Sequence, residues 1–146
     1  MITKKSEIMS VQTAISNLET VQQIYAAFGM GDVPAILDRL SDNAVWEHYG
    51  NTDLVPFAGK FAGKGEILRF FQIMGENTRF SDFQPRNFRE EGNTVINEVY
   101  MEVTAVPTGK NVRLTATFYW TFDGQGKVSH WKNEGDAHLL DAAFTA

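Results

Sequence analysis

The stretch VRLTATFYWTFDGQGKVSHWKNE, residues 112–134, decides the fold class. In its first half, apolar side chains at every second position alternate with polar ones from Val112 to Phe122. A period of two predicts a strand with one face buried. DGQG, residues 123–126, has the composition of a hairpin turn, so the chain should return as a second strand.

That second strand, Lys127 to about Glu134, has two faces of unequal polarity. His130, Lys132 and Glu134 form the set that should be solvated. Successive side chains of a strand point to opposite faces, so we expect Trp131 and Asn133 to face inward.

Two further strands precede this hairpin. Phe80–Glu90 and Thr94–Val106 are each followed by a turn that contains glycine, and they complete a meander of four strands. In the second of them, the set that contains Val99 and Met101 is the more apolar and should face inward.

Helical spacing dominates the first half of the chain. The first helix should bury Ala14, Leu18, Val21, Tyr25 and Phe28. A short second helix, capped by Asp32, should bury Ile36, Leu37 and Leu40. A third helix, opened by Gly63-Lys64-Gly65-Glu66, should bury Ile67, Phe70, Phe71 and Met74.

A short strand, NAVWEHYG (43–50), separates the second and third helices. We expect a turn at Ser41–Asn43 before it and an irregular loop at 50–63 after it. Alternation allows only one of Glu47 and His48 to face inward. Burying an unpaired carboxylate costs more than burying a neutral imidazole, so we expect Trp46 and His48 inside and Glu47 outside.

Segregated helices and strands predict an α+β fold, with a twisted antiparallel sheet that wraps over the helices. We expect residues 1–10 to be a flexible lead-in and residues 11–146 to form one domain.

Composition narrows the function classes. The chain has 146 residues, a formal net charge of −5 and no cysteine. It contains no basic run for nucleic acid, no apolar run of the roughly 20 residues that a membrane helix needs, and no signal peptide. We therefore expect no nucleic-acid partner, no membrane association and a cytoplasmic location. The 12% aromatic content fits an apolar pocket or a bulky core.

Three short segments in order carry a family resemblance: YAAFGMGDVPAILDRLSDNAVWEHYG (25–50), PFAGKFAGKGEILRFF (56–71) and DGQGKVSHWKNEGDAHLL (123–140). Over about residues 15–142 the chain resembles the nuclear-transport-factor-2-like superfamily and its SnoaL-like branch, which is related to the ketosteroid isomerase, polyketide cyclase and cystatin-like folds. The resemblance implies a cone: a curved antiparallel sheet around three N-terminal helices, an internal apolar pocket, and a homodimer formed through the outer sheet face.

The resemblance also assigns roles to positions. The general base of ketosteroid isomerases falls on His48, but their two oxyanion donors fall on Ile24 and Phe118. The Asp–Arg–Asp set of limonene-type epoxide hydrolases falls on Asn133, Val99 and Met101. Neither set is reproduced, so we expect neither a typical ketosteroid isomerase nor such a hydrolase.

These readings define a candidate site. His48 is the candidate general base or acid, since imidazole exchanges protons near neutral pH, and Asn133 is its candidate assistant. The candidate substrate-binding residues are Tyr25, Phe28, Trp46, Phe57, Phe61, Met101, Phe118, Trp120 and Trp131. Core packing is the alternative for the aromatic residues. We expect neither a cofactor nor a metal, since the histidines show no ligand spacing.

Two functions stay open at this stage. The chain binds a small apolar or polycyclic molecule, with proton-transfer chemistry of the cyclase, isomerase or dehydratase (lyase) type at His48. Alternatively, it is a non-catalytic ligand-binding module or a dimeric interaction module whose interface includes Tyr100 and Tyr119.

Overall fold

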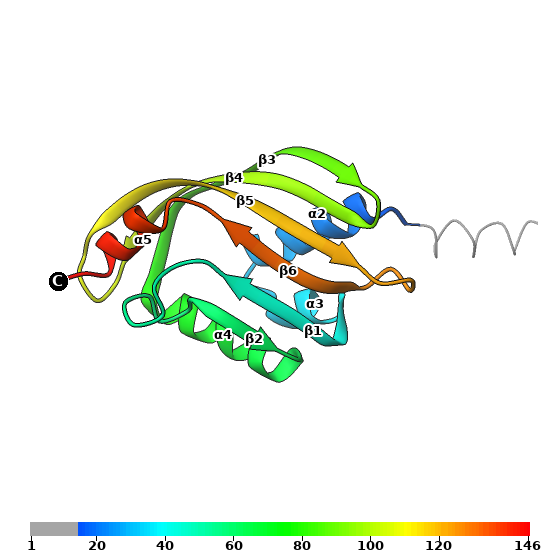
Figure 1. Ribbon diagram of the computed structural model, residues 1–146, viewed down its shortest axis with the longest axis horizontal. Coiled ribbons are helices and arrows are strands. Elements are labelled where there is room, and N and C mark those ends of the chain that lie inside the picture. The colour runs from blue at the N-terminus through cyan, green and yellow to red at the C-terminus, as the bar shows by residue number, and fades with distance from the viewer. Residues whose placement is uncertain (1–14) are drawn as a thin grey trace, which may run out of the picture.

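Six strands form one curved sheet in the order β2-β1-β6-β5-β4-β3 (Figure 1). The structure, a computed structural model, describes residues 15–146. The strands are β1 (Leu40–His48), β2 (Gly59–Ala62), β3 (Thr78–Glu91), β4 (Thr94–Ala105), β5 (Asn111–Phe122) and β6 (Val128–Glu134). The α+β class and the four-strand meander are confirmed.

One strand pair corrects the expectation of an antiparallel sheet. β1 pairs with β6 in parallel, with Trp46 opposite Trp131, whereas the other neighbouring pairs are antiparallel. A parallel pair needs a long connection between its strands. Here the connection contains β2, the third expected helix and the first three strands of the meander, so sequence-local hairpin signals do not reveal it.

The helices are α2 (Asn17–Gly29), α3 (Val33–Leu37), α4 (Lys64–Asn77) and α5 (Ala137–Ala143). Side-chain caps fix the starts of α2, α3 and α5, of which only the Asp32 cap of α3 was predicted from the sequence. Ser16 Oγ accepts from the Glu19 N–H at 3.1 Å, and Asp32 Oδ1 accepts from the Ala35 N–H at 3.2 Å. None of the helices within residues 15–146 is long and apolar enough to cross a bilayer.

The long strands β3, β4 and β5 curve over α2, while α4 lies along β1 and β2 (Figure 1). The apolar faces of α2, α3 and α4 therefore meet the concave face of the sheet. Their fully or nearly buried side chains include Val21, Ile24, Ile36, Ile67 and Phe70. α5 packs against β5 near its first residues (Figure 1).

Two local predictions are wrong. Leu40 is buried, but it begins β1 instead of ending a helix, and Ser41–Asn43 lie within that strand instead of forming a turn. The spacing of Ile36, Leu37 and Leu40 imitates a helix, although α3 ends at Leu37. The loop expected at 50–63 also contains β2, which pairs with β1.

The predicted inward faces are confirmed. Leu114, Ala116, Phe118, Trp120 and Phe122 of β5 are all buried. So are Val99 and Met101 of β4 and Trp131 and Asn133 of β6. The expected lead-in at 1–10, the domain start at 11 and the helix position of Ala14 lie outside the described residues.

Candidate functional site

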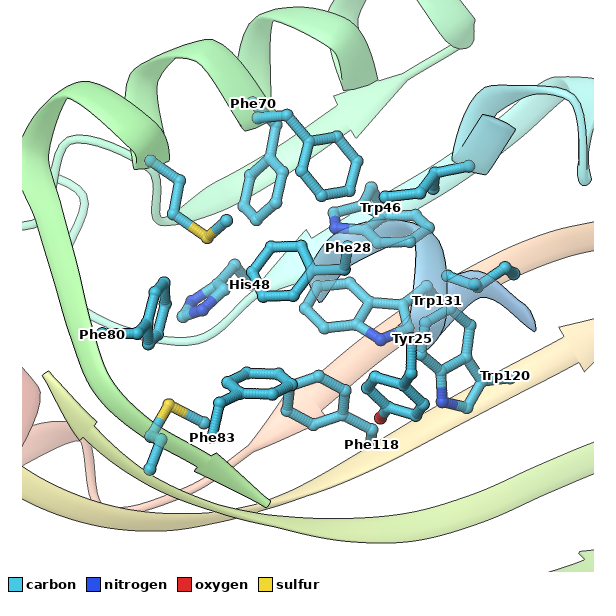
Figure 2. Close-up of a pocket in the computed structure, with 15 residues that line it drawn as sticks. Tyr25, Phe28, Trp46, His48, Phe70, Phe80, Phe83, Phe118, Trp120 and Trp131 are labelled. Carbon is cyan, nitrogen blue, oxygen red and sulfur yellow. The ribbon is translucent and has the colours of Figure 1, made fainter. Parts of the chain in front are cut away.

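An aromatic cavity of about 60 Å³ lies between the helices and the concave face of the sheet. It is lined by Ile24, Tyr25, Phe28, Ile36, Trp46, His48, Phe70, Phe71, Met74, Phe80, Phe83, Met101, Phe118, Trp120 and Trp131. Figure 2 shows His48 near Phe80 at one side of this larger cavity, with Tyr25 and Trp120 at the other. The polar groups are therefore separated by aromatic rings.

A smaller cavity of about 30 Å³ adjoins the larger one. Four residues line both of them: His48, Met74, Phe80 and Met101. Other residues line the smaller cavity but not the larger one, among them Asn133, Tyr49, Phe57, Thr78 and Leu140. The shared wall thus consists of one imidazole, one phenyl ring and two flexible thioethers.

The expected substrate-binding residues are distributed over the larger cavity, the smaller cavity and a position outside both. The larger cavity brings together Tyr25, Phe28, Trp46, Met101, Phe118, Trp120 and Trp131. Phe57 lines the smaller cavity instead. Phe61 lines neither; its ring packs edge-on against Phe70 at 5.3 Å between centroids.

His48 is half-buried at the end of β1 and surrounded by rings. Its centroid lies 5.0 Å from that of Phe57, 5.8 Å from Phe70 and 5.9 Å from Trp131. Burial lowers the pKa of His48 from 6.5 to about 4, and the hydrogen bond to the Tyr49 backbone opposes this only in part. The ring is therefore neutral at pH 7.

The tautomer of His48 follows from one contact. Nδ1 lies 2.7 Å from the Tyr49 carbonyl oxygen. A carbonyl only accepts, so Nδ1 of the neutral ring carries the proton and donates it, and Nε2 keeps its lone pair. Within residues 15–146, Nε2 has no hydrogen-bond partner, so it is available as a proton acceptor.

Asn133 is 5% exposed and is oriented by the same residue. Its Oδ1 accepts from the Tyr49 N–H at 3.0 Å. Because that group is a donor, the oxygen must face it, and this fixes the amide orientation. Nδ2 is then a buried donor without a partner among the described residues.

Tyr49 stacks on His48, with ring centroids 5.1 Å apart and an interplanar angle of 16°. Burial raises the pKa of Tyr49 to about 12, and the carboxylates of Asp136 and Asp141 add to this. Its hydroxyl lies against Gly135, where an added Cβ would come within 2.7 Å of the oxygen. Gly135 therefore makes room for the ring that supports His48.

At the far side of the larger cavity, Asn97 joins two cavity residues. Its amide lies 3.1 Å (Oδ1) and 2.8 Å (Nδ2) from the Tyr25 hydroxyl, and Oδ1 also accepts from Trp120 Nε1 at 3.0 Å. Asn97 is 1% exposed, and burial raises the pKa of Tyr25. The sequence reading did not single out Asn97 as a site residue. Its signal was a lone polar side chain on the inward face of β4.

Trp46 and Trp131 form the floor between β1 and β6. Their rings stack at 4.4 Å with an interplanar angle of 22°. Both Nε1 groups are buried and have no partner within residues 15–146. Together with Asn133 Nδ2, the unpaired buried side-chain polar atoms of this region are all donors.

Glu47 lies on the opposite face of β1, as predicted. Its carboxylate is 2.8 Å from His130 Nε2, and the Glu47 side chain is 42% exposed. Glu47 and His48, which are neighbours in NAVWEHYG, thus lie on opposite faces of the sheet, with His48 at the cavities and Glu47 outside.

Two apolar residues stand where the resemblance puts the isomerase donors. Ile24 and Phe118 both line the larger cavity, and neither side chain can donate a hydrogen bond. Across the described part of the chain, no three His, Asp or Glu side chains gather as a metal-binding group would.

Comparison with known proteins gives one family match. Residues 21–131 match the SnoaL-like domain. No curated protein matches the chain.

Several solved structures are similar in fold. An NTF2-like protein of unknown function from Burkholderia pseudomallei is 24% identical, with a TM-score of 0.79 over 89% of this chain and 98% of that one. An NTF2-like protein from Burkholderia thailandensis is 25% identical, with a TM-score of 0.79 over 90% and 98%. TerC, crystallised with polyporic acid, is 23% identical, with a TM-score of 0.76 over 89% and 98%. At identities this low, the structural similarity establishes a shared fold and does not establish a shared function.

Proposed function

Because the chain belongs to the SnoaL-like domain family, we propose that it binds a small, mostly apolar molecule between its helices and its sheet and moves a proton on that molecule. His48 is the proton acceptor and Asn133 its polar assistant. The chemistry belongs to the cyclase, isomerase or dehydratase type. It requires no group other than these side chains.

The observation that carries this proposal is the state of His48. A neutral imidazole with Nδ1 tied to a carbonyl presents an unprotonated Nε2 among aromatic rings. Apolar aromatic surroundings strengthen interactions with charge that develops during a reaction. A ligand C–H placed against Nε2 would meet a base that is ready at neutral pH.

The cavity supports the small end of the expected ligand range. Its volume of about 60 Å³ is well below the roughly 300–1,000 Å³ of pockets that enclose drug-sized ligands. A compact molecule of one or two rings fits this better than a polycyclic one. A polycyclic ligand would require side chains at the wall to move.

Base-catalysed ring opening of 5-nitrobenzisoxazole tests the proposal. In this reaction the base takes the ring C–H proton, the N–O bond breaks, and the electron pair ends on a coloured phenolate. The wild-type protein should accelerate the reaction, with a rate that rises with pH through about 4 and is flat above it. His48→Gln should abolish the acceleration while calorimetry still detects binding.

His130→Gln is the matched control, because His130 lies on the outer face beside Glu47. Its rate should equal that of the wild-type protein. Equal loss of rate in the two variants would remove His48 from the mechanism.

Non-catalytic binding is the second candidate, and the pKa of His48 favours it. A base with a pKa of about 4 accepts protons less readily than one tuned to neutral pH. Under this alternative, calorimetry would show binding of 5-nitrobenzisoxazole, and turnover would not exceed that of the His48→Gln variant.

A homodimer through the outer sheet face is a further part of the proposal. That face presents Tyr100 beneath Arg86 at 5.6 Å and Tyr119 beneath Lys132 at 5.0 Å. Aromatic and arginine side chains are enriched at interfaces. Light scattering should give twice the chain mass, and Tyr119→Glu should shift it towards the monomer, whereas a wild-type monomer would contradict the proposal.

A further inference from the structure

The smaller cavity has a polar group that the fold itself does not use. Asn133 lines it, and Nδ2 of its amide is a buried donor with no partner in the described residues. Leaving such a donor unpaired costs roughly 1–3 kcal/mol. The amide oxygen is used by the fold, since it accepts from Tyr49 N–H, whereas the amide NH₂ has no such role among the described residues.

The two cavities are separated by side chains that can move. Met74 and Met101 line both of them, together with His48 and Phe80. Unbranched thioethers have several rotatable bonds and adapt to irregular space. A rotamer change at either methionine would open a connection between the two cavities beside His48 without moving the backbone.

We propose that the two cavities form one two-chamber site, in which the larger chamber holds the apolar body of a ligand and the smaller chamber holds an oxygen acceptor bound by Asn133 Nδ2. This rests on the proposed function, since it assigns the ligand of the same site. The ligand class is an aromatic molecule of one or two rings with a carbonyl oxygen at one end.

The chemistry of the unpaired groups selects an acceptor over a donor. In the described part of the chain, the buried side-chain atoms without partners are Trp46 Nε1, Trp131 Nε1 and Asn133 Nδ2, which are all N–H donors. His48 Nε2, which belongs to a residue lining both cavities, is an acceptor, but the proposed function uses it for the proton that is moved. A carbonyl oxygen needs only what Asn133 offers.

A matched pair of probes tests this inference. 4-Phenyl-2-butanone and butylbenzene share a phenyl ring and a four-carbon chain, and only the first carries an oxygen. Wild-type protein should bind the ketone about five- to tenfold more tightly than the hydrocarbon, the value expected of one hydrogen bond to a buried donor. Asn133→Asp keeps the acceptor for Tyr49 N–H and replaces the N–H donor by oxygen, so it should reduce the ratio to about one.

Amide NMR of the wild-type protein gives an independent reading that needs no variant. The ketone should shift the Asn133 side-chain NH₂ signals, and butylbenzene should leave them in place while it shifts the Trp131 indole signal. Equal affinity for the two probes, or an unmoved Asn133 signal with bound ketone, overturns the two-chamber site and leaves the binding proposal standing. If neither probe binds, both proposals fail.

Discussion

The side chains of His48 and Asn133 are both held by the backbone of one residue, Tyr49, through its carbonyl oxygen and its N–H respectively. Nδ1 of His48 lies 2.7 Å from its carbonyl oxygen, and Oδ1 of Asn133 accepts from its N–H at 3.0 Å. Each of these contacts uses one polar atom and leaves the other, Nε2 or Nδ2, without a partner among the described residues. The two candidate groups are therefore oriented through the same residue, without a hydrogen bond between them in the described part of the chain.

Acid should destabilise the protein through His48. The unfolded chain binds this proton near pH 6.5 and the folded chain near pH 4, so between these values the unfolded state binds more protons. Stability is fully present above pH 6.5 and falls as the pH falls towards 4, by about 1–3 kcal/mol. Urea unfolding of wild type and His48→Gln at several pH values measures the difference. Parallel pH profiles would refute the assignment.

The same Trp→Phe change should have different costs at three buried sites. Trp46, Trp120 and Trp131 are 2–3% exposed, but within residues 15–146 only Trp120 has a paired Nε1. Trp120→Phe should cost about 1 kcal/mol more free energy of unfolding than Trp46→Phe or Trp131→Phe, because it also removes a buried hydrogen bond. Guanidinium unfolding compares them, and equal costs would mean that the other two indoles have partners as well.

Asn97 should be coupled to Tyr25 and Trp120. Asn97→Leu leaves the Tyr25 hydroxyl and Trp120 Nε1 unpaired, so it should cost about 3 kcal/mol in the wild-type background. In a Tyr25→Phe/Trp120→Phe background it should cost at least about 1 kcal/mol less. A thermodynamic cycle from chemical unfolding gives the coupling, and additive costs would argue against the network.

Gly135→Ala should disturb the site from outside it. The new Cβ would come within 2.7 Å of the Tyr49 hydroxyl, so the ring that stacks on His48 must shift. We expect a loss of about 1–3 kcal/mol and a changed His48 ring signal by NMR. Gly75→Ala in α4 is the control: its Cβ would meet nothing within 4 Å, so it should stabilise by about 0.5–1 kcal/mol. An unmoved His48 signal in Gly135→Ala would contradict the proposed support.

The strands of the meander could be predicted because the alternation of apolar and polar residues within each strand indicates which face is buried. The alternation from Val112 to Phe122 needs no knowledge of the partner strand. β2 could not be found this way. It has four residues, begins with Gly59, and exists because Phe61 meets Trp46 across the edge of the sheet.

The inward placement of Trp46 and Asn133 followed from alternation and the cost of burial. The contacts that orient His48 and Asn133 did not follow, because both run through the backbone of Tyr49 and depend on the parallel register of β1 and β6. Asn97 was missed for a related reason. Its partners come from α2 and β5, far from it in sequence.

The stacked pair Trp46–Trp131 and the nearby Trp120 are all the tryptophans that the chain contains, and all three line the larger cavity. Indole emission is sensitive to the polarity of its surroundings and to quenching by neighbouring groups. The tryptophan fluorescence of this protein therefore originates entirely from the cavity wall. A ligand that enters should change the emission of the native, unlabelled chain, which makes the protein its own optical sensor for screening compounds.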